Sequence, residues 1–253
     1  MQPALKRTEL HKSIADLYKQ AEQNPFILRA KRVLAQQLMD VDPHGAHIAL
    51  AMLEALQFEI DSMRNHFRIA AQYEKHHLEL TLLNQVTAEW ACARGLEAAA
   101  IAARCAEQYR DSLDAQRIAT QAMMRRANFE QALKYWNRLD QLGGASNPEV
   151  IGMDKELNFI INMLVEHGLN EHDTADYISL AFDYLTEHKI RPLRTEYHFG
   201  EDGMIIEFEV DKPIRECLEL TRAVDDKIID GDYPLSSLIV LGFIPVARKA
   251  DAA

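Results

Sequence analysis

The histidines near carboxylates are the first candidates for chemistry. His44 and His47 are three residues apart at a predicted helix start, so both imidazoles could reach one metal ion, but no third ligand lies nearby. Residues 74–79 and 171–173 also combine histidine with acidic residues, yet neither has a zinc-site spacing. They are typical of a solvated turn and of a helix cap. We therefore predict no metal site and no cofactor.

A second candidate set lies on residues 204–210, where the alternation of apolar and polar residues predicts a strand. Metal-dependent nucleases carry strand carboxylates followed by a lysine, with an acidic residue two positions before it. This chain has Lys212 but Val210 two positions earlier. Glu207 and Glu209 point to one face of an alternating strand, which we predict to be its solvent face.

An enzyme, either a hydrolase or a nuclease, is the alternative that these residues support. Its site would lie near His198, Glu207 and Glu209, where helices meet the sheet. The sequence has no phosphate loop, no dinucleotide-binding fingerprint and no nucleophile elbow, and its ten glycines offer little of the backbone freedom that such sites need. We assign no catalytic residue from the sequence.

Charge and composition restrict the partners of this 253-residue chain. Its 28 basic and 39 acidic residues give a net charge of -11, which disfavours direct binding to nucleic acid or to anionic lipid. No apolar run reaches the length of a signal peptide or of a membrane span. Cys92, Cys105 and Cys217 are odd in number and far apart, which predicts reduced thiols. We expect a cytoplasmic protein.

The elements that would position these residues are mainly helices. Apolar residues recur every three or four positions through residues 1–147, which predicts a helical array. We expect a break near residues 63–65 within a long third segment, and a tight turn at Gly95. The predicted helices cover residues 8–23, 26–39, 46–73, 78–94, 96–110, 111–126 and 129–142.

Residues 127–136 read Ala-Asn-Phe-Glu-Gln-Ala-Leu-Lys-Tyr-Trp. This segment resembles the opening of the second helix of a tetratricopeptide repeat, and the resemblance covers about one repeat, residues 112–142. Phe67, Leu96 and Phe129 each precede an alanine by three residues, at spacings of 29 and 33. A generic solenoid of helical hairpins explains the same pattern.

The resemblance implies an inner face, formed by the first helix of each hairpin, that holds peptides. Partner-binding candidates on this face are Asn84, Arg117, Gln121 and Arg125, with Ala88 and Asp114 beside them. Such a mixed groove suits an acidic or C-terminal peptide. An ordinary charged helix surface accounts for the same residues.

Residues 148–253 have a different pattern, which predicts two more helices and a small α+β module. The two helices cover residues 149–167 and 173–188. A β-hairpin is predicted at about 193–210, a long helix at about 212–229, and a third strand or a short helix at about 237–246.

The leading functional hypothesis is an intracellular adaptor or scaffold that binds a protein partner through the helical array. Strand pairing by the C-terminal module would offer a route to a homodimer, with Leu193, Tyr197, Phe199, Ile206 and Phe208 partly interfacial. An acidic inhibitor of a basic or nucleic-acid-binding protein is a further alternative, supported by the net charge alone.

Overall fold

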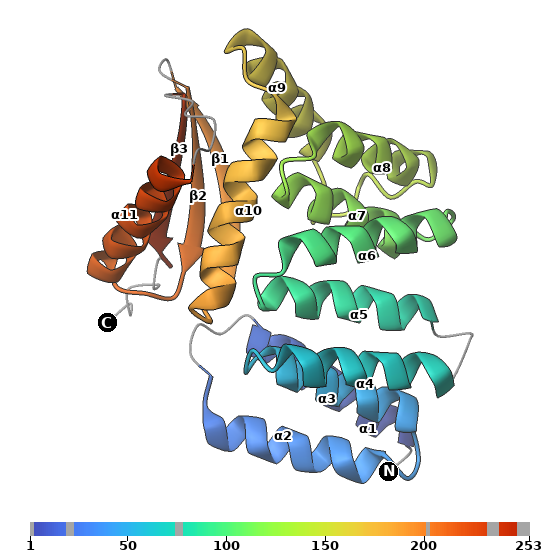
Figure 1. Ribbon diagram of the computed structural model, residues 1–253. Coiled ribbons are helices and arrows are strands. Elements are labelled where there is room, and N and C mark those ends of the chain that lie inside the picture. The colour runs from blue at the N-terminus through green and yellow to red at the C-terminus, as the bar shows by residue number, and fades with distance from the viewer. Residues whose placement is uncertain (1–2, 19–22, 74–77, 201–202, 232–237, 247–253) are drawn as a thin grey trace, which may run out of the picture.

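The computed structural model describes residues 3–18, 23–73, 78–200, 203–231 and 238–246. Within these ranges the protein is mostly helical, with eleven helices and one three-stranded sheet near the C-terminus (Figure 1). The predicted fold class is therefore confirmed. None of the described helices is long and apolar enough to cross a membrane. The predicted turns at residues 201–202 and 232–234, and the histidine run at 74–77, lie outside the described residues.

Helices α1 to α8 form a stacked array (Figure 1). They are α1 (Pro3–Tyr18), α2 (Pro25–Leu38), α3 (Pro43–Ala55), α4 (Ile60–Tyr73), α5 (Leu78–Ala91), α6 (Gly95–Gln108), α7 (Leu113–Arg125) and α8 (Phe129–Gln141). Several of these helices start at a polar residue whose side chain accepts a hydrogen bond from a backbone N–H group that has no partner within the helix. Asn24 caps α2, Asp42 caps α3 and Ser112 caps α7.

Three hairpins of the array turn through the same backbone conformation. Phe58, Ala93 and Ala127 have φ values of 57°, 58° and 54°, in the left-handed region, although none is glycine. In each turn the next N–H donates to a carbonyl five residues back, for example Asn128 to Met123 at 3.0 Å. This is the Schellman pattern, which satisfies carbonyls at a helix end. The three turn residues are 35 and 34 positions apart.

These turns correct two expectations about the array. The long third segment breaks at Phe58 rather than near residues 63–65. Counting from the turn residues, the equivalents of Phe129 are Gly95 and Ile60 rather than Leu96 and Phe67. The repeated feature is a backbone conformation that no glycine marks, which is why residue types alone misaligned the hairpins. The resemblance to tetratricopeptide repeats stays a prediction.

The C-terminal part begins with two helices and continues into the sheet. Its elements are α9 (Met153–Glu166), α10 (Glu171–Glu187), β1 (Pro192–Gly200), β2 (Gly203–Val210), α11 (Ile214–Asp230) and β3 (Ile239–Pro245). The predicted hairpin is present, with Tyr197 opposite Ile206, and the tail is a strand that pairs parallel to β2. Helix α9 begins later than predicted, after Gly152 at φ 79°, and leaves Ile151 exposed.

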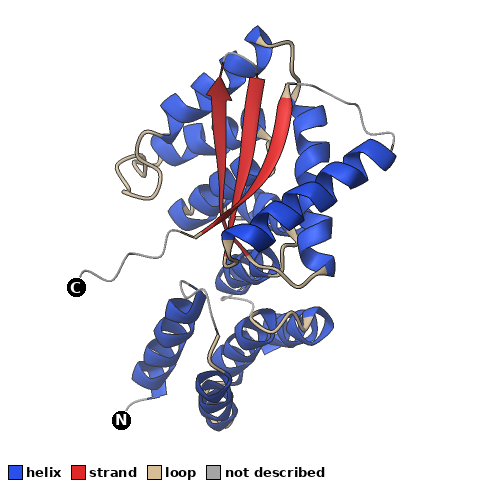
Figure 2. Cartoon of the chain, turned by 90° about the vertical axis from the view of Figure 1, so that its left-hand side faces the viewer, coloured by secondary structure: helices blue, strands red, loops and turns tan. Residues whose placement is uncertain are grey.

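The sheet has one covered and one open face. Its three strands lie side by side in the order β1-β2-β3 (Figure 2). Ile206 and Phe208 on the covered face are fully buried, so they are not available to the dimer surface suggested by the sequence. Phe208 meets Phe182 of α10 edge-on, and residues of α11 belong to the same core. Glu207 and Glu209 alternate with these residues and lie on the open face, as predicted.

Helix α5 is shared between two hydrophobic clusters. Ala88 and Cys92 belong to the cluster built from α1 to α4, whereas Leu82, Val86 and Trp90 belong to a second cluster that continues into the sheet. The second half of the array and the C-terminal module therefore share one core. The division of the chain into domains at residue 147 stays a prediction.

Helix α10 connects the array to the sheet by packing across the hairpin turns. The Thr186 hydroxyl donates to the carbonyls of Cys92 and Ala93, both at 3.2 Å, and Arg126 donates to the Ser179 hydroxyl at 2.7 Å. Between these contacts the Phe182 ring meets Trp90 edge-on, with centroids 5.0 Å apart. Gly95 lies against the same ring.

We predict that Gly95→Ala destabilises the protein by about 1–3 kcal/mol, the usual cost of overpacking. A Cβ at position 95 would lie 2.9 Å from two carbons of the Phe182 ring, which is itself held between other rings. Urea unfolding would measure the loss. In a double-mutant cycle, Phe182→Leu should restore part of the stability that Gly95→Ala removes. A Gly95→Ala variant as stable as the parent would contradict the close contact.

We predict that Lys189→Gly stabilises the protein by about 1 kcal/mol, because glycine adopts the left-handed region without the clash of a Cβ. Lys189 has a φ of 53° and is exposed, so its side chain contributes little packing. The melting temperature should rise for Lys189→Gly and stay near that of the parent for Lys189→Ala. Equal shifts for the two variants would argue against backbone strain.

Candidate functional site

One hollow of the surface lies where the array meets the sheet. It has a volume of about 450 Å³ and is lined by residues of α7, α9 and β1 and of the segment between α8 and α9. Its lining residues are Gln121, Met124, Arg125, Glu149, Met153, Glu156, Arg194, Thr195, Glu196, Tyr197 and His198. We call it the α7–β1 cavity. Strand β1 is an edge strand, and it forms one wall of this cavity beside the predicted peptide groove.

Three of the four groove residues that the sequence suggested, Arg117, Gln121 and Arg125, lie on α7 at intervals of four residues, and Asn84 lies on α5. Gln121 and Arg125 line the α7–β1 cavity. Arg117 lies one turn earlier on α7 and forms ion pairs with Asp114 and Glu149. Asn84 belongs to α5, where its amide donates to the Leu80 carbonyl at 2.8 Å, and it is not among the residues lining the cavity.

Arg125 is the notable cation of the α7–β1 cavity. Its guanidinium lies 4.8 Å from the centroid of the Trp90 ring, and it has no ion pair or hydrogen bond with any residue that the structure describes. Burial lowers the pKa of Arg125, although an arginine stays charged at neutral pH. The cavity therefore offers a cation that no carboxylate of the described chain neutralises.

Three potential metal ligands meet on the open face of the sheet. His198 Nε2 lies 3.0 Å from a carboxylate oxygen of Glu207 and 3.5 Å from one of Glu196. The enzyme hypothesis anticipated His198, Glu207 and Glu209 together, but Glu209 lies opposite Arg194 in another row of the β1–β2 pair. Glu196 takes its place because it is directly opposite Glu207. We call these three residues the Glu–His–Glu cluster.

The first histidine pair considered from the sequence does not form a common site. His44 Nε2 is hydrogen-bonded to the Thr81 hydroxyl at 2.9 Å. His47 Nδ1 instead meets Nδ1 of His66 at 2.8 Å, and its ring stacks on Tyr73. The two imidazoles therefore have separate partners, and the fold uses both in helix packing.

The cysteines are poor candidates for nucleophiles. All three are buried and free of disulfides. Burial raises the pKa of Cys92 to about 12 and that of Cys105 to about 11, so both remain thiols at neutral pH.

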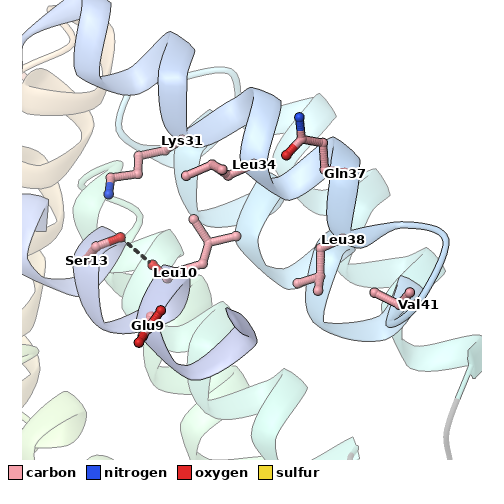
Figure 3. A pocket seen from close by; sticks show the side chains of 8 residues that line it. All are labelled: Glu9, Leu10, Ser13, Lys31, Leu34, Gln37, Leu38 and Val41. Atoms are coloured by element: carbon pink, nitrogen blue, oxygen red, sulfur yellow. Dashed lines mark hydrogen bonds between the residues drawn. The ribbon is translucent and has the colours of Figure 1, made fainter. Parts of the chain in front are cut away.

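A second hollow lies between α1 and α2, at the N-terminal end of the array. Its volume is about 420 Å³. In Figure 3 side chains of α1 and α2 face one another across it, with Leu10 of α1 pointing toward Leu34 of α2. The lining residues are Glu9, Leu10, Ser13, Lys31, Leu34, Gln37, Leu38 and Val41. We call it the α1–α2 groove.

Helix α2 is apolar on two opposite sides. Leu28, Ala35 and Leu38 face the core, whereas Phe26, Ala30, Val33 and Leu34 are exposed. The exposed set falls at positions i, i+4, i+7 and i+8, which form one continuous stripe of a helix. Phe26 is 83% exposed and Leu34 is 47% exposed. We call this set the α2 stripe.

The α2 stripe corrects the inward face expected from the sequence. The three- and four-residue apolar spacing that predicts the helix at residues 26–39 also predicts one inward face, yet Ile27, Val33 and Leu34, which follow this spacing, are exposed. A helix with two apolar faces satisfies the same periodicity in two rotations, so spacing alone could not decide which face packs. The sequence signal for a second apolar face is the excess of apolar residues in α2.

Comparisons with known proteins give no match, whether against protein-family models, curated proteins or solved structures.

The paired histidines predict a dependence of stability on pH. Burial lowers the pKa of His47 and of His66 below the value of about 6.5 expected in the unfolded chain. The unfolded state then binds more protons in this range, so stability falls as the pH drops below about 6.5. Urea unfolding across this range should show a smaller fall for His66→Gln than for the parent.

The control for this experiment is His172→Gln, because the side chain of His172 is 85% exposed. This variant should keep the pH dependence of the parent. The same slope in all three proteins would show that the His47–His66 pair does not carry the effect.

Proposed function

We propose that this protein is an adaptor that binds an amphipathic helix with acidic edges along α2. The observation that carries the proposal is the α2 stripe, an apolar surface at the end of a helical array that no described element covers. The apolar face of a helix normally packs against another element. A partner helix laid along the stripe would supply the missing cover.

The charge of α2 indicates the chemistry of the partner. The helix contains Arg29, Lys31 and Arg32 but no acidic residue, in a chain whose net charge is -11. Arg32 forms an ion pair with Glu54 at 2.9 Å. Arg29 and Lys31 have no acidic partner among the described residues, so both could meet carboxylates on the edges of a bound helix.

The shape of this end of the array suits the same mode of binding. The α1–α2 groove lies along one side of α2, with Leu34 in its wall. A different hollow, with a volume of about 600 Å³, lies along another side of α2. Arg29, Val33 and Leu56 are among the residues that line it. A helix presents side chains at i, i+3, i+4 and i+7, and the two hollows could receive such anchors.

The inner face suggested by the sequence remains a second contact for the same partner class. Arg125 in the α7–β1 cavity could receive a carboxylate, such as that of an acidic or C-terminal peptide. Buried free thiols are compatible with a cytoplasmic location, which is part of this proposal.

We predict that Leu34→Glu weakens binding of a synthetic Leu-faced helix with glutamate edges by more than about tenfold, because it places a carboxylate in the groove wall. Leu218→Glu on α11 is the matched control, since Leu218 is 52% exposed and Leu34 is 47% exposed. This control should bind like the parent. Isothermal titration calorimetry would give the affinities.

Three further experiments distinguish the alternative partners and binding surfaces. A peptide with lysine edges should bind more weakly, and equal binding would contradict the charge argument. Light scattering would reveal self-association, and a dimer abolished by Leu34→Glu would mean that a second copy covers the stripe instead. The double variant Arg117→Glu and Arg125→Glu should still bind the helical peptide. If it loses binding while Leu34→Glu does not, the partner occupies the inner face.

A further inference from the structure

We propose that the Glu–His–Glu cluster, formed by Glu196, His198 and Glu207, binds a divalent transition-metal ion of the zinc class. This inference is independent of the adaptor proposal, because the cluster lies on the sheet and the α2 stripe lies at the other end of the array. All three ligand atoms lie within 4.8 Å of one another.

The strands bring the ligands together through their register. Glu196 and His198 are two residues apart on β1, so their side chains share one face of the sheet. Glu207 on β2 is directly opposite Glu196. This face is the open one, and the side chains of Glu196 and Glu207 are 28% and 30% exposed. An ion could therefore reach the cluster from solvent.

The spacing of the donor atoms fits a metal site. In a tetrahedral zinc site with bonds of about 2.1 Å, neighbouring ligand atoms are about 3.4 Å apart. His198 Nε2 lies 3.0 Å and 3.5 Å from oxygens of Glu207 and Glu196. One nitrogen and two carboxylate oxygens suit zinc-class ions, whereas calcium and magnesium prefer oxygen alone.

Electrostatics also point to a cation at this position. Two glutamates placed directly across neighbouring strands repel each other and destabilise the pairing. Arg194 Nη1 lies 2.7 Å from the other carboxylate oxygen of Glu196, whereas Glu207 has no arginine or lysine partner among the described residues. The alternative that the experiment must distinguish is a cluster held without metal by the Arg194–Glu196 ion pair and the contacts of His198.

The position of the cluster suggests what a bound ion could do. Glu196 and His198 line the α7–β1 cavity together with Arg125, which has no acidic partner among the described residues. Three protein ligands leave a tetrahedral ion with an open coordination position, as in sites where metals bind a small ligand.

The test uses the untagged full-length chain after treatment with a chelator. Zn²⁺ would be titrated in competition with a chromophoric chelator, and Co²⁺ would be followed by its visible absorption. We expect one ion per chain, with affinity reduced more than about tenfold in His198→Ala and in Glu207→Gln.

Glu209→Gln is the matched control, because Glu209 lies on the same strand and face but outside the cluster. It should bind Zn²⁺ like the parent and show the same Co²⁺ spectrum. Circular dichroism would verify that every variant is folded. Absence of binding in the parent, or equal loss in Glu209→Gln and Glu207→Gln, would overturn the proposal.

Discussion

The packing of α10 across the hairpin turns is the contact on which the rest of the structure depends. Phe182 is at its centre, between Trp90 of the array and Phe208 of the sheet. Together with Tyr197 of β1, which donates to the Met124 carbonyl at 2.8 Å, the Phe182 ring links the array to the sheet. The absence of a side chain at Gly95 allows the approach, since a Cβ there would meet the ring at 2.9 Å.

This packing also explains why polar residues gather beside the array. Because one face of the sheet packs against α10 and α11, the alternation of side chains along each strand places every second residue on the open face. Glu196, His198 and Glu207 are such residues, and β1 carries the first two to the wall of the α7–β1 cavity. Arg125 reaches the same cavity from α7 because its guanidinium rests on Trp90.

The two ends of the array differ in the same physical terms. At the C-terminal end the apolar surface of the last hairpins continues into the sheet and is covered. At the N-terminal end α2 keeps a second apolar face that no described element covers. Arrays of stacked repeats require polar capping elements at their ends for solubility. The proposed partner would cover this face of α2, and the basic residues of the helix are the reason for proposing an acidic one.

The sequence by itself determined the mostly helical class, the β-hairpin and the solvent face of Glu207 and Glu209, because helical spacing and strand alternation are local properties. It misplaced the turn at Phe58, since a left-handed backbone at a residue other than glycine has no local signature. Only the tertiary structure decided which face of α2 packs, because both faces are apolar. It also decided that Glu196 joins His198 and Glu207, because strand register results from packing and brings together residues that are distant in the chain.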